Sequence, residues 1–170
     1  MFLLSKVEYL GHQISSEGIH PLDSKIDAIV KAPVPVNVQQ LRSFLGLINY
    51  YGKFIPNLST LLQPLNELLQ TGSKWKWSTN REEAFREAKK QLVSANVLTH
   101  YNRALPIKLA ADASAYGVGA VISHKMPDGS ERPIGFASRT LTSSEKNYAQ
   151  LEKQALSLIF GVKKFHQIGR

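Results

Sequence analysis

The segment Leu109–Ser123, which reads LAADASAYGVGAVIS, decides the fold of this chain. Its small and aliphatic residues predict a strand that ends near Asp112, a turn, and a second strand that returns beside the first. Asp112 is the only acidic residue between Glu87 and Asp128. An ionised carboxylate among apolar residues is usually paired or bound to a cation, so Asp112 is a candidate ligand for Mg²⁺. The alternative is that Asp112 caps a turn, because Asp readily bonds its own backbone there.

The strand pattern extends on both sides of this segment. The sequence predicts strands over about 106–112, 116–125 and 131–138, with a turn at 126–129 between the last two. Gly117 and Gly119 lie inside the second strand pattern, with no helix directly after them. We therefore interpret them as positions where another backbone approaches closely, and not as a nucleotide-binding loop.

A capping box predicts the start of a long helix, because Thr142 is followed three residues later by Glu145. The helix has an apolar stripe with the 3.6-residue period, which we expect to be its buried face: Tyr148, Leu151, Ala155, Leu158, Ile159, Val162 and Phe165. Glu152 lies at the edge of this stripe, where its carboxylate could face the strand that carries Asp112. Two such carboxylates suit a hard divalent ion. The alternative for Glu152 is an ordinary solvated helix residue.

The first half of the chain is predicted to be mostly helical. Residues 7–14 alternate as a strand does, and residues 15–18 form a turn. Asp23 begins a short helix to about Val30, which the prolines of 32–35 end. Asn37 caps the next helix, whose apolar residues share one face: Leu41, Phe44, Leu45, Ile48 and Tyr51.

A third helix holds the leucines of 61–69, and residues 71–73 form a linker. Either Ser78 or Thr79 is expected to cap a helix over about 80–94, and Thr79 and Glu82 make a second capping box. We expect the buried side of that helix to contain Phe85, Ala88, Leu92 and Val93.

These elements predict an α+β fold in two parts. Residues 1–72 form a helical segment. Residues 73–170 form a connecting helix followed by a mixed domain of three antiparallel strands and one helix.

The chain also resembles gypsy-type LTR retroelement polyproteins over nearly its whole length. Residues 7–19 (VEYLGHQISSEGI) resemble the end of the reverse-transcriptase palm, residues 41–56 (LRSFLGLINYYGKFIP) the thumb, and residues 74–77 (KWKW) the connection. The segment around Asp112, with FASRTL at 136–141 and EKNYAQLEKQAL at 145–156, resembles the start of the ribonuclease H domain.

The resemblance implies cleavage of the RNA strand of RNA–DNA hybrids with Mg²⁺, or alternatively Mn²⁺. Asp112 and Glu152 match the first two of the family's four carboxylates and would be the catalytic metal ligands. The sequence ends before the strand that carries the third, so we expect a truncated ribonuclease H-like domain with weak or absent cleavage. The resemblance also implies contacts with an RNA–DNA hybrid or another duplex, for which the candidates are Arg42, Tyr51, Lys53 and Arg139.

The family's polymerase site is a Tyr-x-Asp-Asp turn, which this sequence does not contain. We therefore expect no DNA synthesis by this chain. Two alternatives to a nuclease stay open: a non-catalytic nucleic-acid-binding module, and an inactive relic of a retrotransposon.

The formal net charge of +8 favours a polyanionic partner, although net charge also serves solubility. The chain has no cysteine, and it shows neither a signal peptide nor an apolar run long enough to span a bilayer. We therefore expect an intracellular protein, in the cytoplasm or nucleus, with no membrane partner.

Overall fold

The computed structural model describes residues 5–95 and 97–168. Its first part is an antiparallel sheet of β1 (Lys6–Tyr9), β2 (His12–Ser15) and β3 (Gly18–Pro21). The predicted single strand over 7–14 is wrong, because Leu10 and Gly11 have φ values of 46° and 75°. Two consecutive positive φ values make the tight turn of a hairpin, so the chain reverses in the middle of the predicted strand.

The next two helices follow the sequence prediction. Helix α1 spans Asp23–Val30, and α2 spans Val38–Tyr50. The side-chain oxygen of Asn37 caps α2 by accepting a hydrogen bond of 2.9 Å from the backbone N–H of Gln40. The apolar face predicted for this helix is buried throughout: Leu41, Phe44, Leu45, Ile48 and Tyr51.

After η1 (Gly52–Phe54), the predicted third helix is a series of short turns: α3 (Leu58–Leu61), α4 (Gln63–Asn66) and η2 (Glu67–Leu69). Pro64 lies in the first turn of α4, where its missing N–H is tolerated. The pieces still bury their leucines in one core, so the prediction of an apolar helical segment is correct but its continuity is not.

Helix α5 spans Thr79–Val93 and begins after Ser78. The predicted capping box of Thr79 and Glu82 is wrong, because the Glu82 carboxylate instead accepts a hydrogen bond of 2.6 Å from Nε1 of Trp77. The buried side contains Ala84, Phe85, Ala88 and Leu92, whereas Val93 is exposed.

The second sheet consists of β4 (Ile107–Ala113), β5 (Gly117–Lys125) and β6 (Glu131–Thr140), antiparallel in that order. All three predicted strands are confirmed. The two strand glycines do permit a close approach, since a Cβ on Gly117 would lie 2.7 Å from Oγ of Ser59 at the start of α3.

The chain then forms α6 (Ser143–Lys146) and α7 (Gln150–Phe165). The capping box of Thr142 and Glu145 is confirmed, but the helix that it starts ends after four residues, and α7 is a separate helix. The predicted buried face of α7 is wrong. Its buried residues are Lys153, Ser157 and Gly161, and most of the apolar stripe is exposed to solvent: Tyr148, Leu151, Ala155, Leu158, Ile159 and Val162.

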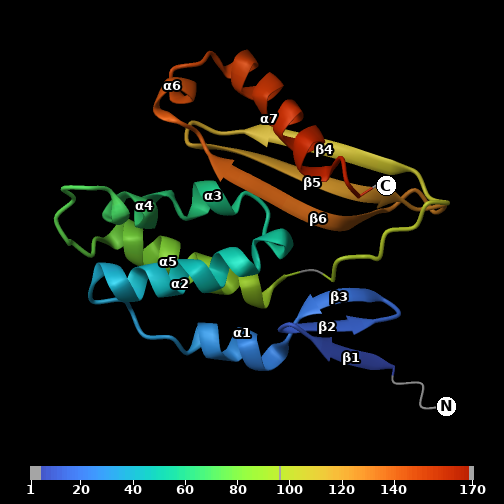
Figure 1. Cartoon of the computed structure of the whole chain (residues 1–170), viewed down its shortest axis with the longest axis horizontal. Coiled ribbons are helices and arrows are strands. Elements are labelled where there is room, and N and C mark those ends of the chain that lie inside the picture. The colour runs from blue at the N-terminus through green and yellow to red at the C-terminus, as the bar shows by residue number, and fades with distance from the viewer. Residues whose placement is uncertain (1–4, 96, 169–170) are drawn as a thin grey trace.

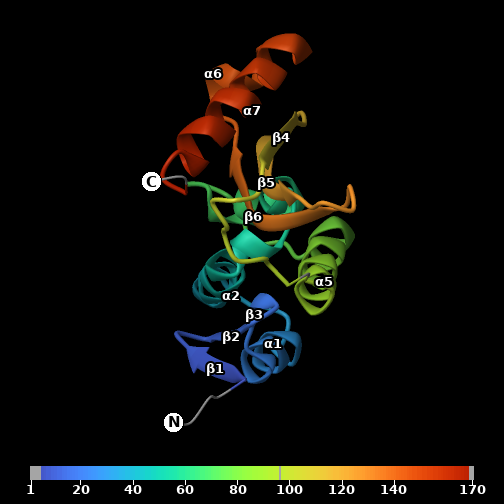
Figure 2. The ribbon, with the colours of Figure 1, turned by 90° about the vertical axis from the view of Figure 1, so that its right-hand side faces the viewer.

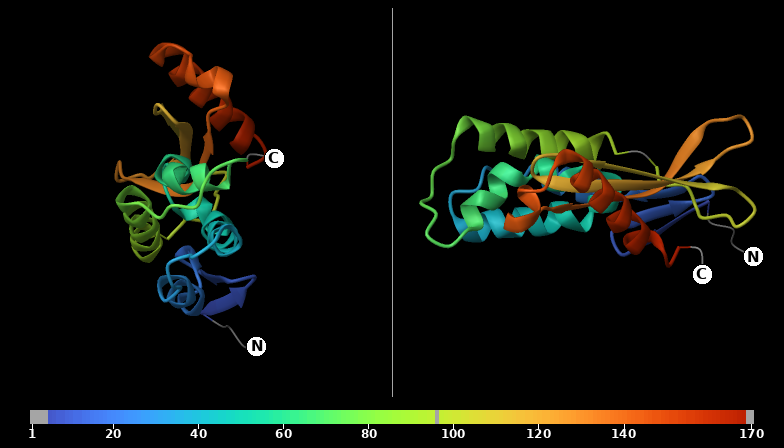
Figure 3. Two further views of the ribbon diagram at one scale, coloured as in Figure 1. Left: turned by 90° about the vertical axis from the view of Figure 1, so that its left-hand side faces the viewer. Right: turned by 90° about the horizontal axis from the view of Figure 1, so that it is seen from above.

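These elements are arranged in layers (Figures 1 and 2). Helix α7 covers one face of the β4–β6 sheet, while α3 lies against the other face, with α2 and α5 beyond it. The sheet β1–β3 and α1 form the far end (Figure 3). The larger hydrophobic core is formed by the helices from α1 through α5, and a smaller one lies between the second sheet and α7. The division into 1–72 and 73–170 stays a prediction, although α5 packs with the first part.

Candidate nucleic-acid and metal site

The pleat of the second sheet determines where Asp112 points. Asp112 pairs with Gly119 across β4 and β5, so the two residues share one face of the sheet. Their neighbours Ala113 and Ala120 face the other side, where α7 packs. Asp112 therefore lies on the face that α3 approaches, and α7 covers the opposite face.

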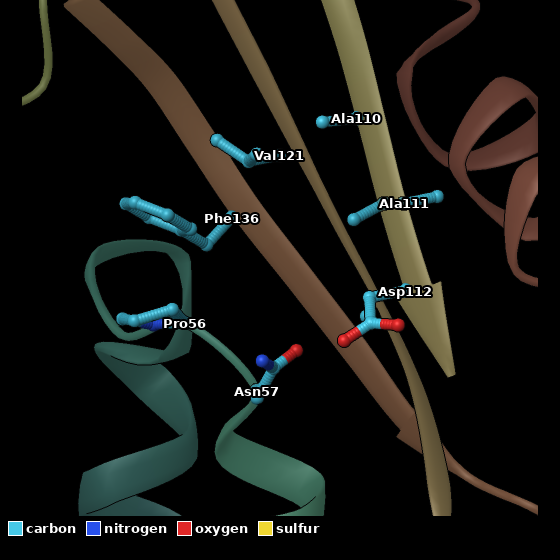
Figure 4. Close-up of a pocket in the computed structure, with 9 residues that line it drawn as sticks. Pro56, Asn57, Ala110, Ala111, Asp112, Val121 and Phe136 are labelled. Carbon is cyan, nitrogen blue, oxygen red and sulfur yellow. The ribbon is translucent and has the colours of Figure 1, made fainter. Parts of the chain in front are cut away.

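The carboxylate of Asp112 is exposed at one end of a small pocket of about 150 Å³ (Figure 4). Pro56 and Asn57 form one wall of this pocket, and apolar residues of the sheet, such as Val121 and Phe136, form the other. Asp112 Oδ1 accepts a hydrogen bond of 2.8 Å from the backbone N–H of Ala113. One carboxylate oxygen is thus used by the strand, and the carboxylate as a whole lies beside Asn57 (Figure 4).

Glu152 lies in the first turn of α7, and its carboxylate accepts a hydrogen bond of 2.7 Å from the backbone N–H of Ala149. This bond satisfies one of the free N–H groups at the helix start. Glu152 is exposed, and its helix lies across the sheet from the side chain of Asp112. The two carboxylates thus belong to elements on different faces of the sheet, and a metal site shared by them stays a prediction. Within the described ranges, no three His, Asp or Glu side chains form a group that could hold a metal.

Two of the predicted nucleic-acid contacts, Lys53 and Arg139, do lie together. They line a hollow of about 420 Å³ between η1, β6 and α7, to which α7 adds Lys164. We call Lys53, Arg139 and Lys164 the basic hollow. No carboxylate pairs with Lys53 or Lys164 in the part of the chain that the structure describes.

Arg139 is the member of the basic hollow that has a protein partner. Its guanidinium donates two hydrogen bonds, of 2.7 Å and 2.9 Å, to the carboxylate of Glu145. These bonds and the N–H of Thr142 lower the pKa of Glu145 to about 2, so the pair is charged at neutral pH. The guanidinium carbon also lies 5.7 Å from the ring centre of Phe160. Arg139 thus holds the start of α6 against α7.

The other two predicted contacts lie apart from the hollow. Tyr51 is only 3% exposed, and its hydroxyl donates to the backbone oxygen of Gly11, which gives it a packing role between α2 and the first sheet. Burial raises the pKa of Tyr51. Arg42 is exposed on α2.

Comparison with known proteins identifies the family. Residues 77–169, more than half of the chain, match the RNase H-like domain found in reverse transcriptase. The chain belongs to this family. Domains of this family generally depend on divalent metal ions, and its members include parts of retroelement polyproteins.

Among curated proteins, the chain is 38% identical over 162 residues to the Transposon Tf2-3 and Tf2-4 polyproteins of Schizosaccharomyces pombe. The match covers 95% of this chain but only 12% of each polyprotein's length. The resemblance to gypsy-type LTR retroelement polyproteins is therefore confirmed.

Among solved structures, a foamy viral protease-reverse transcriptase in complex with double-stranded DNA matches 98% of this chain and 29% of its own, with 25% identity and a TM-score of 0.84. The same viral enzyme in complex with an RNA/DNA hybrid matches 97% of this chain and 22% of its own, with 26% identity and a TM-score of 0.81. The expected α+β fold of a retroelement RNase H-like segment is confirmed. Among the described residues, no helix has the length and apolar character to cross a bilayer.

Sequence reasoning missed two residues of these sites. Asn57 belongs to no motif in the sequence, and the one signal is that Asn is among the residues that tolerate a left-handed backbone. Lys164 gives no signal in the sequence, because the helix dipole is a sufficient reason for a lysine in the last turn of a helix. Only the tertiary structure shows that Lys164 lines the same hollow as Lys53 and Arg139.

Proposed function

We propose that this segment binds the phosphate backbone of duplex nucleic acid, above all an RNA–DNA hybrid, as part of a reverse transcriptase and ribonuclease H polyprotein. The observation that carries the proposal is the basic hollow. Lys53 and Lys164 come from distant parts of the sequence and line one concave surface, and no described carboxylate forms an ion pair with either.

The electrostatics of Lys53 fit this role. Burial lowers the pKa of its ammonium from the ordinary value, because the charged form loses hydration at the edge of η1. A phosphate placed in the hollow would favour the charged form again. Contacts of this kind depend on charge and duplex shape, so we expect no preference for base sequence.

The comparisons support this proposal without extending it to the whole protein. The structural neighbours are complexes of a related viral enzyme with double-stranded DNA and with an RNA/DNA hybrid. The chain spans only 12% of the length of the curated polyproteins that it matches. We therefore propose for this segment only a part in the activity of such a polyprotein.

Asp112 is the proposed metal ligand for cleavage of the RNA strand. Its open oxygen fits Mg²⁺, which is usually held by one or two carboxylates together with water and substrate phosphates. A divalent ion at this position would stabilise the charge that develops on the scissile phosphate. Glu152 is exposed on α7, which packs on the other face of the sheet, so we propose Asp112, and not the pair, as the primary ligand.

The test of duplex binding measures the anisotropy of a labelled RNA–DNA hybrid at several salt concentrations. Lys53→Gln combined with Lys164→Gln should weaken binding and reduce the slope of log K against log salt by roughly 2, because two phosphate contacts are lost. The matched control is Lys31→Gln with Lys90→Gln, which removes the same charge from exposed lysines of α1 and α5.

Equal loss of affinity in both double variants would mean that only net charge matters and would refute the proposed contact surface. Cleavage is measured separately with Mg²⁺ and an end-labelled hybrid. Asp112→Asn should remove any cleavage while the hybrid stays bound.

A further inference from the structure

Asn57 adopts a backbone conformation that few residues tolerate. Its φ of 50° and ψ of 32° lie in the left-handed region, where a short polar side chain such as Asn is favoured over most others. This conformation turns the chain sharply between η1 and α3. As a result, the side-chain amide points at the second sheet and lines the same pocket as Asp112 (Figure 4).

Gly119 provides the room for this amide. A Cβ on Gly119 would lie 2.0 Å from Oδ1 of Asn57, so the amide oxygen lies directly over the glycine. Gly119 is also the cross-strand partner of Asp112. Because side chains of such partners start about 5 Å apart on the same face, the amide oxygen and the Asp112 carboxylate are close neighbours.

The turn that carries Asn57 is held in place by polar contacts with the sheet. The backbone N–H of Ser59 donates a hydrogen bond of 3.0 Å to Oγ of Ser138. The hydroxyls of Thr60 and Ser114 share a hydrogen bond of 2.9 Å. These contacts anchor the start of α3 on β6 and on the turn between β4 and β5, which fixes the position of the amide before any ligand arrives.

The bonds that the protein makes to the Asn57 amide and the Asp112 carboxylate do not explain why the two groups lie side by side. Among the described residues, no hydrogen bond is made by the Asn57 side chain, and Asp112 makes only its bond to Ala113. Both residues are exposed at the mouth of the pocket, so a ligand from solvent can reach them.

We propose that Asn57 is a second protein ligand, beside Asp112, of a bound divalent cation. Amide and carboxylate oxygens are the ligands that such hard ions take, and the remaining positions suit water and the phosphates of a bound duplex. The inference rests on the proposed metal role of Asp112 and adds a ligand from the turn between η1 and α3. The ion would then join the two parts of the chain.

The test measures the binding of Mn²⁺ to the full chain, by electron paramagnetic resonance of the free ion, with and without a hybrid. Asn57→Gly removes the amide but keeps the left-handed backbone, and it should weaken binding about tenfold. Asn57→Asp keeps a short side chain and adds a charged oxygen, so it should tighten binding. Asp112→Asn should remove most of the binding. Circular dichroism checks that each variant is folded.

The outcomes separate the two proposals. If Asp112→Asn removes binding but Asn57→Gly leaves it unchanged, Asn57 is not a ligand, and the role of Asp112 stands. If Asn57→Asp weakens binding, the amide acts as a hydrogen-bond donor to Asp112, and the inference is overturned. If the original chain binds no Mn²⁺, or Asp112→Asn has no effect, both fail. The hybrid-binding proposal is judged by its own lysine variants.

Discussion

At the scale of single residues, Gly119 connects three features of this molecule. It pairs with Asp112 in the sheet, it makes room for the amide of Asn57, and it lies on the face where α3 docks. No other residue type has a side chain small enough for this position, since a Cβ would come within 2.0 Å of the Asn57 oxygen. The requirement for glycine here is steric and comes from another segment of the chain.

The first prediction follows from this contact. Gly119→Ala should lower the free energy of unfolding by about 1–3 kcal/mol, because the added methyl group must displace Asn57 and the start of α3. Chemical denaturation monitored by tryptophan fluorescence measures the change.

Gly135→Ala is the control, since a Cβ there would meet nothing nearer than the ring of Phe165 at 3.8 Å. A loss of stability as large in the control as in Gly119→Ala would attribute the effect to strand glycines in general. A combined Gly119→Ala and Asn57→Gly variant should recover part of the loss.

At the scale of elements, α7 shows how a regular pattern can be assigned to the wrong face. Its apolar stripe has the period of a helix, and the most exposed member, Leu151, is 78% exposed. The side that packs on the sheet has small residues instead, with Ser157 only 1% exposed and Gly161 beside Ala120. Small residues let the helix axis approach the strands closely.

The second prediction tests the orientation of α7. Leu151→Gln should change the free energy of unfolding by no more than about 0.5 kcal/mol, because the side chain is in solvent. Ser157→Leu should cost about 1–3 kcal/mol, because its larger side chain must enter the packed layer between helix and sheet.

Urea denaturation of both variants measures these changes. The reverse order, with Leu151→Gln the more damaging substitution, would show that the apolar stripe is covered and would contradict the described packing.

At the scale of the whole molecule, the two cores differ in size. Among the described residues, the core of α1 to α5 buries 18, including large aromatic and aliphatic side chains, whereas the core between the second sheet and α7 buries three. The part that carries Asp112 is therefore held by few apolar contacts and by the polar docking of α3.

The third prediction concerns local unfolding. Backbone amides of α7 and β4 should exchange with solvent at a lower opening free energy than those of α2 and α5, because fewer buried contacts oppose their opening. Hydrogen exchange followed by mass spectrometry measures the order. Faster exchange in α2 than in α7 would contradict the unequal stability of the two cores.

The sequence by itself determined most of the elements and their ends. Asn37 and Thr142 marked helix starts, and the three strands of the second sheet appeared where alternation and turns placed them. These features depend on contacts between residues a few positions apart, which a local pattern records. The family was also readable at this level, because its motifs are contiguous stretches.

Only the tertiary structure decided which residues meet. Asp112 and Glu152 match by residue type, but only the structure shows their surroundings: the pleat of β4 directs Asp112 toward α3, and Glu152 caps α7. Asn57 and Lys164 gained neighbours that lie far away in sequence. The physical reason is that a helix or a strand has two sides. Its own period identifies the sides, but only packing against the rest of the chain selects the one that is buried.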